Sequence, residues 1–149
     1  MGHALGDTQT RTRTRSTQGF TLIEMLIVVG LIGILASISY GAYTNYVRDS
    51  FRAEAQSTLL QFQQAMERFY TENNTYAGSH TGGTPNADVF PSTSPPNSSD
   101  PKYTLSITST DSSYTLTATP VENELMEDDG TLTLEHTGQK THNGNNSWE

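Results

Sequence analysis

The residues with the clearest chemical potential lie at the start of a long apolar run. Gly19 precedes Phe20, and Glu24 lies inside the run FTLIEMLIVVGLIGILASISY that Phe20 opens. An ionisable residue in an apolar span costs free energy in lipid and marks a functional position by default. A cut after Gly19 would create a positive α-amine on Phe20, about one helical turn from Glu24. Where such helices pack side by side, we expect the amine of one chain to neutralise Glu24 of another.

Glu24 also has a purely local interpretation. An acid in the first turn of a helix is favoured by the helix macrodipole. The intermolecular pair would contribute at most about 4 kcal/mol at a separation of about 4 Å and an effective dielectric near 20, before desolvation is subtracted. We favour the pair, because in a lone helix in lipid we expect an apolar residue to serve better than Glu24.

The apolar run predicts a membrane helix. About twenty residues give a helix of roughly 30 Å, the thickness of a bilayer core. Three upstream arginines, Arg11, Arg13 and Arg15, predict a cytoplasmic N-terminal side. A secretory signal peptide is cut after a shorter apolar region, whereas the plausible cut here precedes it. We expect a cleaved basic leader (1–19), a membrane and polymerisation helix (20–40), and a head outside the inner membrane (41–149).

Other chemistry is not indicated by the sequence. The chain has no cysteine, which excludes thiol catalysis and thiolate metal sites. The acidic run Glu127–Asp129 lacks the spacing of a calcium loop, and such runs are usually solvated. The four histidines share no metal-ligand spacing, and no phosphate loop, nucleophile elbow or catalytic carboxylate pair is found. The sequence therefore predicts no enzyme, no metal and no cofactor.

The charge distribution argues against nucleic acid as a partner. After residue 19 the chain holds five Lys/Arg and fifteen Asp/Glu, a balance of −10. Binding to a phosphate backbone needs basic residues that displace counterions. We therefore expect no nucleic acid partner.

Beyond the membrane helix, apolar residues continue at helical spacing. Every step is three or four residues, which indicates one buried face of a helix that ends near Thr71–Asn74. The members of this stripe are Tyr40, Tyr43, Val47, Phe51, Ala55, Leu59, Phe62, Met66 and Phe69.

The second half of the chain reads as a loop followed by strands. Residues 78–102 are rich in Pro, Gly, Ser and Asn and predict a connection without elements of its own. Alternation from Tyr103 and from Tyr114, joined by a turn at 110–113, predicts a hairpin, and Leu132 and Leu134 add a strand. We expect an α+β fold with a long N-terminal helix on a three- or four-stranded antiparallel sheet (103–136) and a C-terminal tail.

The segment Gly19-Phe20-Thr21-Leu22-Ile23-Glu24 resembles the class III leader and N-terminal helix of type IV pilins and type II secretion pseudopilins. The resemblance implies the pilin fold, cleavage between Gly19 and Phe20 by the membrane prepilin peptidase, and N-methylation of Phe20. It implies partners among other pilin subunits, the inner-membrane pilus assembly machinery and the membrane itself. The strands YTLTATP and GTLTL and Trp148 are similar to minor pilins of the PilE kind. Those relatives carry cysteines where this chain has Asp129 and Ser147, so the loop between these positions lacks the family's disulfide.

These observations favour a structural subunit, a minor pilin of a type IV pilus that supports pilus assembly, twitching motility or adhesion. It would cross the inner membrane once and then move to the extracellular filament. The alternative is a type II secretion pseudopilin, whose leader is the same. A DNA-uptake pilin is a third possibility, which the small number of basic residues disfavours.

Overall fold

The computed structural model describes residues 19–122 and 125–148, without the side chain of Ser39. The predicted leader, except for Gly19, lies outside the described residues. The chain divides into two compact units, Met1–Ser39 and Tyr40–Glu149. We call the first the N-terminal unit and the second the head. Helix α1 (Leu22–Asn73) contributes residues to both units.

In the N-terminal unit, the described residues form the first part of α1 and the short approach to it. The large apolar side chains from Leu22 to Ile38 are 43–79% exposed. In the part of the chain that the structure describes, α1 is the one helix long and apolar enough to cross a membrane, judged by length and composition. An apolar surface of this size costs free energy in water, so the N-terminal unit needs an apolar environment.

In the head, α1 buries one stripe of its surface. Ala55, Leu59, Phe62 and Met66 are fully buried, at steps of four, three and four residues. The predicted stripe is therefore confirmed over this stretch, with the residues at either end partly buried. It is wrong at its start, because Tyr40 and Tyr43 are exposed. The helix ends as predicted, at Asn73, where Asn74 adopts a left-handed conformation (φ 57°) and its N–H bonds to the Tyr70 carbonyl at 2.7 Å.

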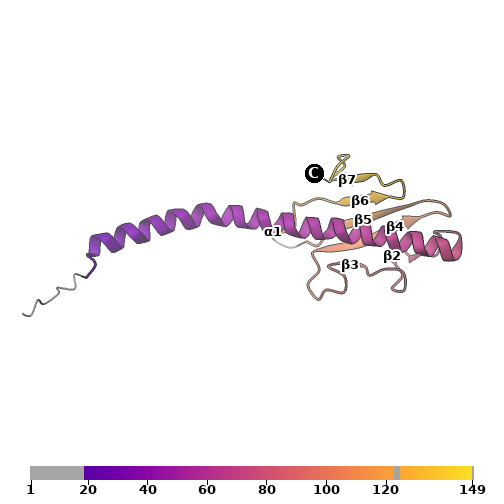
Figure 1. The fold of residues 1–149 in the computed structure, drawn as a ribbon, viewed down its shortest axis with the longest axis horizontal. Coiled ribbons are helices and arrows are strands. Elements are labelled where there is room, and N and C mark those ends of the chain that lie inside the picture. The colour runs from indigo at the N-terminus through magenta and orange to yellow at the C-terminus, as the bar shows by residue number, and fades with distance from the viewer. Residues whose placement is uncertain (1–18, 123–124, 149) are drawn as a thin grey trace, which may run out of the picture. The chain divides into compact units, whose positions relative to one another are not determined.

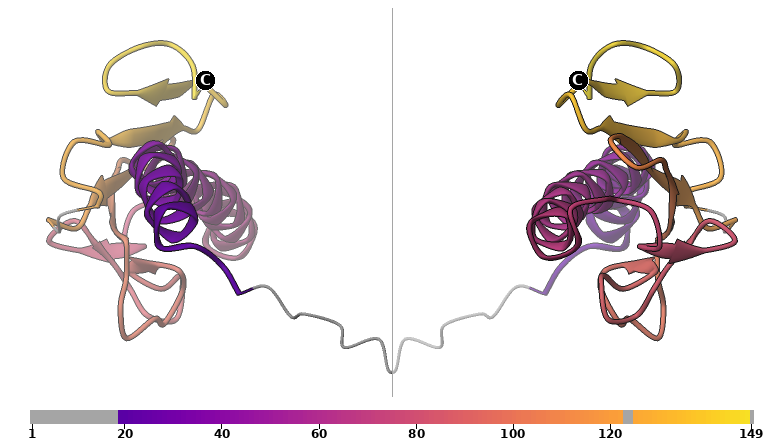
Figure 2. Two further views of the ribbon diagram at one scale, coloured as in Figure 1. Left: turned by 90° about the vertical axis from the view of Figure 1, so that its left-hand side faces the viewer. Right: turned by 90° about the vertical axis from the view of Figure 1, so that its right-hand side faces the viewer.

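In the head, α1 lies along one face of an antiparallel sheet (Figure 2), and the buried stripe belongs to the same core cluster as side chains of the strands. Among the described residues this sheet has five strands in chain order, joined as a meander. The strands are β3 (Thr93–Ser94), β4 (Tyr103–Ser109), β5 (Tyr114–Pro120), β6 (Leu132–Glu135) and β7 (Lys140–His142) (Figure 1). The α+β fold of a long helix on an antiparallel sheet is thus confirmed.

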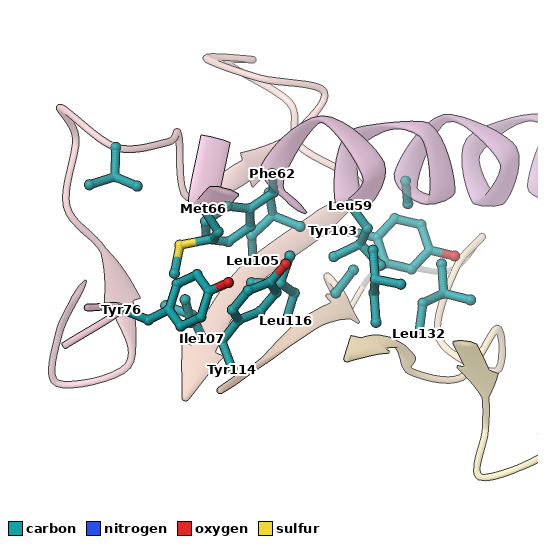
Figure 3. Close-up of a cluster of buried hydrophobic side chains, with 14 of the residues drawn as sticks. Leu59, Phe62, Met66, Tyr76, Tyr103, Leu105, Ile107, Tyr114, Leu116 and Leu132 are labelled. Carbon is teal, nitrogen blue, oxygen red and sulfur yellow. The ribbon is translucent and has the colours of Figure 1, made fainter. Parts of the chain in front are cut away.

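The predicted hairpin is confirmed at the residue level. Leu105 pairs with Ala118 and Ile107 with Leu116, so both strands place their apolar residues on the helix side. The turn 110–113 is closed by a hydrogen bond from the Thr110 N–H to the Ser113 carbonyl at 2.8 Å. These pairs belong to one cluster of buried side chains with the α1 stripe (Figure 3).

Two expectations about the sheet were wrong. The segment 78–102 was predicted to lack elements, but it holds β3 and a separate two-stranded sheet of β1 (His80–Thr81) and β2 (Thr84–Pro85). The predicted tail holds β7, so the main sheet has five strands rather than three or four. Strands of two or three polar residues have no readable alternation. β3 and β7 form because β4 and β6 offer free edges, whereas β1 and β2 pair with each other. For example, the Leu105 N–H bonds to the Ser92 carbonyl, next to β3, at 2.8 Å.

Candidate functional site

The predicted processing segment lies just before α1. Gly19 and Phe20 have no regular structure, and Phe20 is 76% exposed. Thr21 stands at the N-cap of α1, and Glu24 is the third residue of the helix. The Glu24 N–H bonds to Thr21 Oγ1 at 3.2 Å, and the Thr21 N–H lies 3.5 Å from Glu24 Oε2. This reciprocal arrangement is a capping box, in which two unpaired helix-end donors are satisfied.

The capping box corrects one expectation about Glu24. The carboxylate does serve its own helix, which an apolar residue at this position could not do. The capping box leaves the Glu24 carboxylate able to accept further hydrogen bonds, because a carboxylate has about four acceptor positions and Glu24 is exposed. Capping and pairing with a neighbouring α-amine are therefore compatible.

The head carries a buried ion pair that the sequence did not reveal. Asp129 has a fully buried side chain, and both of its oxygens accept from Arg52 on α1, with Arg52 Nε 3.1 Å from each. The Tyr103 hydroxyl on β4 donates to the same carboxylate. Asp129 raises the pKa of Arg52, chiefly through the hydrogen bond. Burial and then the bond to Asp129 raise the pKa of Tyr103, so that it stays a protonated donor.

The loop before β6 (described residues 125–131) is shaped so that Asp129 reaches this position. Gly130 has φ +83°, and a Cβ there would lie 3.0 Å from Cβ of Asn143, so both conformation and space favour glycine. His142 Nε2 lies 2.6 Å from the Asp129 carbonyl oxygen. One turn before Arg52 on α1, Arg48 Nε donates to the Leu125 carbonyl at 2.9 Å. Two arginines of α1 thus hold the loop.

The prediction that the run Glu127–Asp129 is solvated was wrong at its last residue. Glu127 and Asp128 are exposed, but Asp129 is 4% exposed. The resemblance to minor pilins of the PilE kind implies a cysteine at the place that Asp129 occupies. That coincidence was the available signal that position 129 tethers the loop, here by an ion pair.

A second cluster of polar side chains fixes the C-terminal part of α1. The hydroxyls of Tyr76 and Tyr114 both donate to Glu67, with Tyr76 Oη 3.1 Å from Oε2 and Tyr114 Oη 2.7 Å from Oε1. Burial, then the bond to Glu67, raises the pKa of Tyr76 to about 12. The rings of Tyr76 and Tyr114 meet edge to face with centroids 4.7 Å apart, and both point toward the core in Figure 3.

These clusters hold the fold together rather than perform catalysis. The tyrosine pKa shifts keep the hydroxyls protonated, the opposite of what a general base requires. In the described ranges, no group of three or more His, Asp or Glu side chains could hold a metal ion.

The ion pair generates a stability prediction for the head fragment 46–149, which contains the whole core and should unfold cooperatively. Asp129→Ala removes the buried carboxylate that Arg52 and Tyr103 share, although Arg52 keeps its contact with the exposed Asp49. We therefore expect the free energy of unfolding to fall by about 3 kcal/mol, or on the order of 10–20 °C in Tm. Asp128→Ala is the matched control, because that neighbouring carboxylate is exposed. Thermal melts followed by circular dichroism measure both. Equal melting temperatures for the two variants would show that the ion pair does not hold the loop.

Comparison with known proteins agrees with this architecture. Residues 41–133 match the family model described as "Type IV minor pilin ComP, DNA uptake sequence receptor", and residues 14–40 match the prokaryotic N-terminal methylation motif. The chain is 38% identical over 60 residues to the type IV major pilin protein PilA of Myxococcus xanthus, covering 40% of this chain and 27% of PilA. It is 38% identical over 80 residues to the type IV major fimbrial protein FimA of Dichelobacter nodosus, covering 45% and 51%. The chain therefore spans between about a quarter and half of these curated relatives.

Among solved structures, a type IV pilin from Shewanella oneidensis superposes with a TM-score of 0.47 and 27% identity, over 67% of this chain and 97% of that one. The Neisseria meningitidis non-core minor pilin PilV gives 0.49 and 21%, over 68% and 92%. The family match covers most of the head and the motif match covers the start of α1. These matches do not favour the pseudopilin alternative. The chain belongs to the type IV pilins, in the minor-pilin family represented by ComP.

Proposed function

We propose that the protein is made as a single-pass inner-membrane precursor, cleaved between Gly19 and Phe20, N-methylated on Phe20, and built into a type IV pilus as a minor subunit. Its partners in this pathway are the prepilin peptidase, the inner-membrane assembly machinery and other pilins. In the pilus it supports assembly, twitching motility or adhesion.

The observation that carries the proposal is the exposed apolar surface of the N-terminal unit. From Leu22 to Ile38 the apolar side chains are exposed on every side of α1. Two environments can cover such a helix all round: lipid, or the helices of other subunits. A precursor in the membrane uses the first and a filament uses the second, so one helix serves both stages.

Glu24 favours transfer of the helix from lipid into the filament, and it favours one axial position of the helix there. In the bilayer its charge is a cost, which the capping box only partly offsets. In a filament, the new α-amine of a neighbouring Phe20 can pair with the exposed carboxylate. The pair forms at one axial stagger between subunits, and it therefore favours that stagger over others.

A second candidate function follows from the family description, in which ComP is named a DNA uptake sequence receptor. The head of this chain has five Lys/Arg against fourteen Asp/Glu. Four of the five basic side chains have intramolecular contacts. Arg48 and Arg52 hold the loop before β6, Lys102 Nζ lies 2.6 Å from Asp100, and Lys140 Nζ lies 4.8 Å from the centre of the Trp148 ring. We therefore favour the structural role over DNA binding.

The first prediction concerns processing. Intact-mass analysis of membrane protein from the native host should show Phe20 as the N-terminus, heavier by one methyl group. A product that retains residues before Gly19, or one cut after the apolar run, would refute the proposed pathway. Gly19→Val should accumulate as the uncleaved precursor, because a branched side chain then stands at the cleavage site.

The second prediction separates the two roles of Glu24. Glu24→Gln keeps the capping box, since glutamine serves at this position as glutamate does, but it removes the charge. Glu24→Val removes both. If charge pairing drives assembly, both variants should be inserted and cleaved but be reduced about tenfold or more in sheared pili. Immunoblots of the membrane and filament fractions measure this, and a tenfold loss corresponds to about 1.4 kcal/mol in the free energy of incorporation. If Gln enters filaments like the wild type and Val does not, the cap alone explains Glu24.

The third prediction concerns DNA. The head fragment 46–149 should not shift double-stranded DNA at physiological salt and micromolar protein, because its surface charge is strongly negative. Mobility-shift assays at low and physiological salt measure this. Tight binding that weakens with salt and is lost in Lys102→Ala and Lys140→Ala would instead support the DNA receptor function.

A further inference from the structure

Three tyrosines interrupt the expected pattern of α1. Tyr40, Tyr43 and Tyr46 are 74%, 67% and 75% exposed, although the periodicity placed the first two on a buried face. They lie in the first turns of α1 within the head, before the stripe that the sheet covers. Within the described residues they are large aromatic side chains that the head leaves uncovered.

Their spacing places them together on the helix. A step of three residues turns an α-helix by about 300° and advances it by about 4.5 Å. The three rings therefore cover about a third of the circumference over an axial length of about 9 Å. The residues between them, such as Gly41 and Asn45, are small or polar, so the tyrosines dominate this surface.

Counting along the sequence gives their depth in a membrane. The span from Phe20 to Ser39 has twenty residues. Its helical part, from Leu22 onward, is about 27 Å long, close to a hydrocarbon core of about 30 Å. The headgroup layer on each side adds about 5–7 Å. Tyr40 then lies at the edge of the hydrocarbon, and Tyr43 and Tyr46 lie in or at the border of the headgroup layer. The first charged residues after the span, Arg48 and Asp49, follow beyond it.

We propose that Tyr40, Tyr43 and Tyr46 form an interfacial anchor that binds the phospholipid headgroup layer on the outer side of the inner membrane and fixes the depth of the precursor. Tyrosine suits this layer because its ring is apolar and its hydroxyl can bond to lipid ester and phosphate oxygens. The proposal rests on the membrane-inserted precursor described above. Its consequence is that the cleavage site at the other end of the span is held at a constant depth.

A spin label can test the depth directly, because the chain has no cysteine of its own. We would place a nitroxide on Asn45→Cys in the full chain, in vesicles of phosphatidylethanolamine and phosphatidylglycerol. Collisions with oxygen and with a water-soluble nickel chelate report the depth of the label. A label on Gln64→Cys, an exposed position of the head, gives the fully aqueous reference.

The expected result is a label at headgroup depth that moves outward by about one helical turn, roughly 5 Å, when all three tyrosines become serine. Leu60→Ser is the matched control, an apolar-to-serine change at an exposed position on the same helix, and should not move the label.

The proposal is wrong if the Asn45→Cys label is as aqueous as the one at position 64, or if the triple variant leaves its depth unchanged. It is also wrong if depth is unchanged while entry into sheared pili is lost, since the tyrosines then pack against other subunits. Because the vesicle measurement needs no filament, it decides the anchor even if the wild-type chain never enters pili.

Discussion

The head depends on the burial of one helical stripe by the sheet. Leu59, Phe62 and Met66 are fully buried, and a buried side chain of this size contributes about 1.5–3 kcal/mol. Strands β4 and β5 supply the complementary face, and the short strands β3 and β7 extend it at the edges. Helix α1 contributes to both units, so the element that supplies the buried stripe of the head also carries the apolar surface of the N-terminal unit. The core of the head and the exposed apolar surface of the N-terminal unit thus both depend on one helix.

Polar clusters complete what apolar packing leaves open. Apolar packing is non-directional, whereas a hydrogen bond also fixes the distance and angle between its two groups. Asp129 binds Arg52 toward one end of the buried stripe, and Glu67 binds two tyrosine hydroxyls toward the other. The two clusters therefore fix the axial position of α1 on the sheet.

Much of this fold could be predicted from the sequence, because apolar residues recur along the chain with the period of a helix or of a strand. The buried stripe from Phe51 to Phe69 repeats every three or four residues, and the β4–β5 hairpin alternates every second residue. The end of α1 follows from the point where the stripe stops. Periodicity does not indicate where a sheet ends, which is why Tyr40 and Tyr43 were placed in the core. It also misses strands too short to alternate. The Thr21–Glu24 capping box was readable, because a threonine followed three residues later by glutamate is its signature. The ion pair of Asp129 was not, since its partner Arg52 lies 77 residues earlier in the chain.

The Asp129–Arg52 pair also changes what the cell must provide for this subunit. A pilin head closed by a disulfide waits for a thiol oxidase and for the electron acceptor that recharges it. This chain has no thiol to oxidise, so its head reaches the closed form by packing and charge alone. Closing this head therefore needs no oxidant. Reducing surroundings, which open disulfide-closed heads, leave the loop before β6 in place.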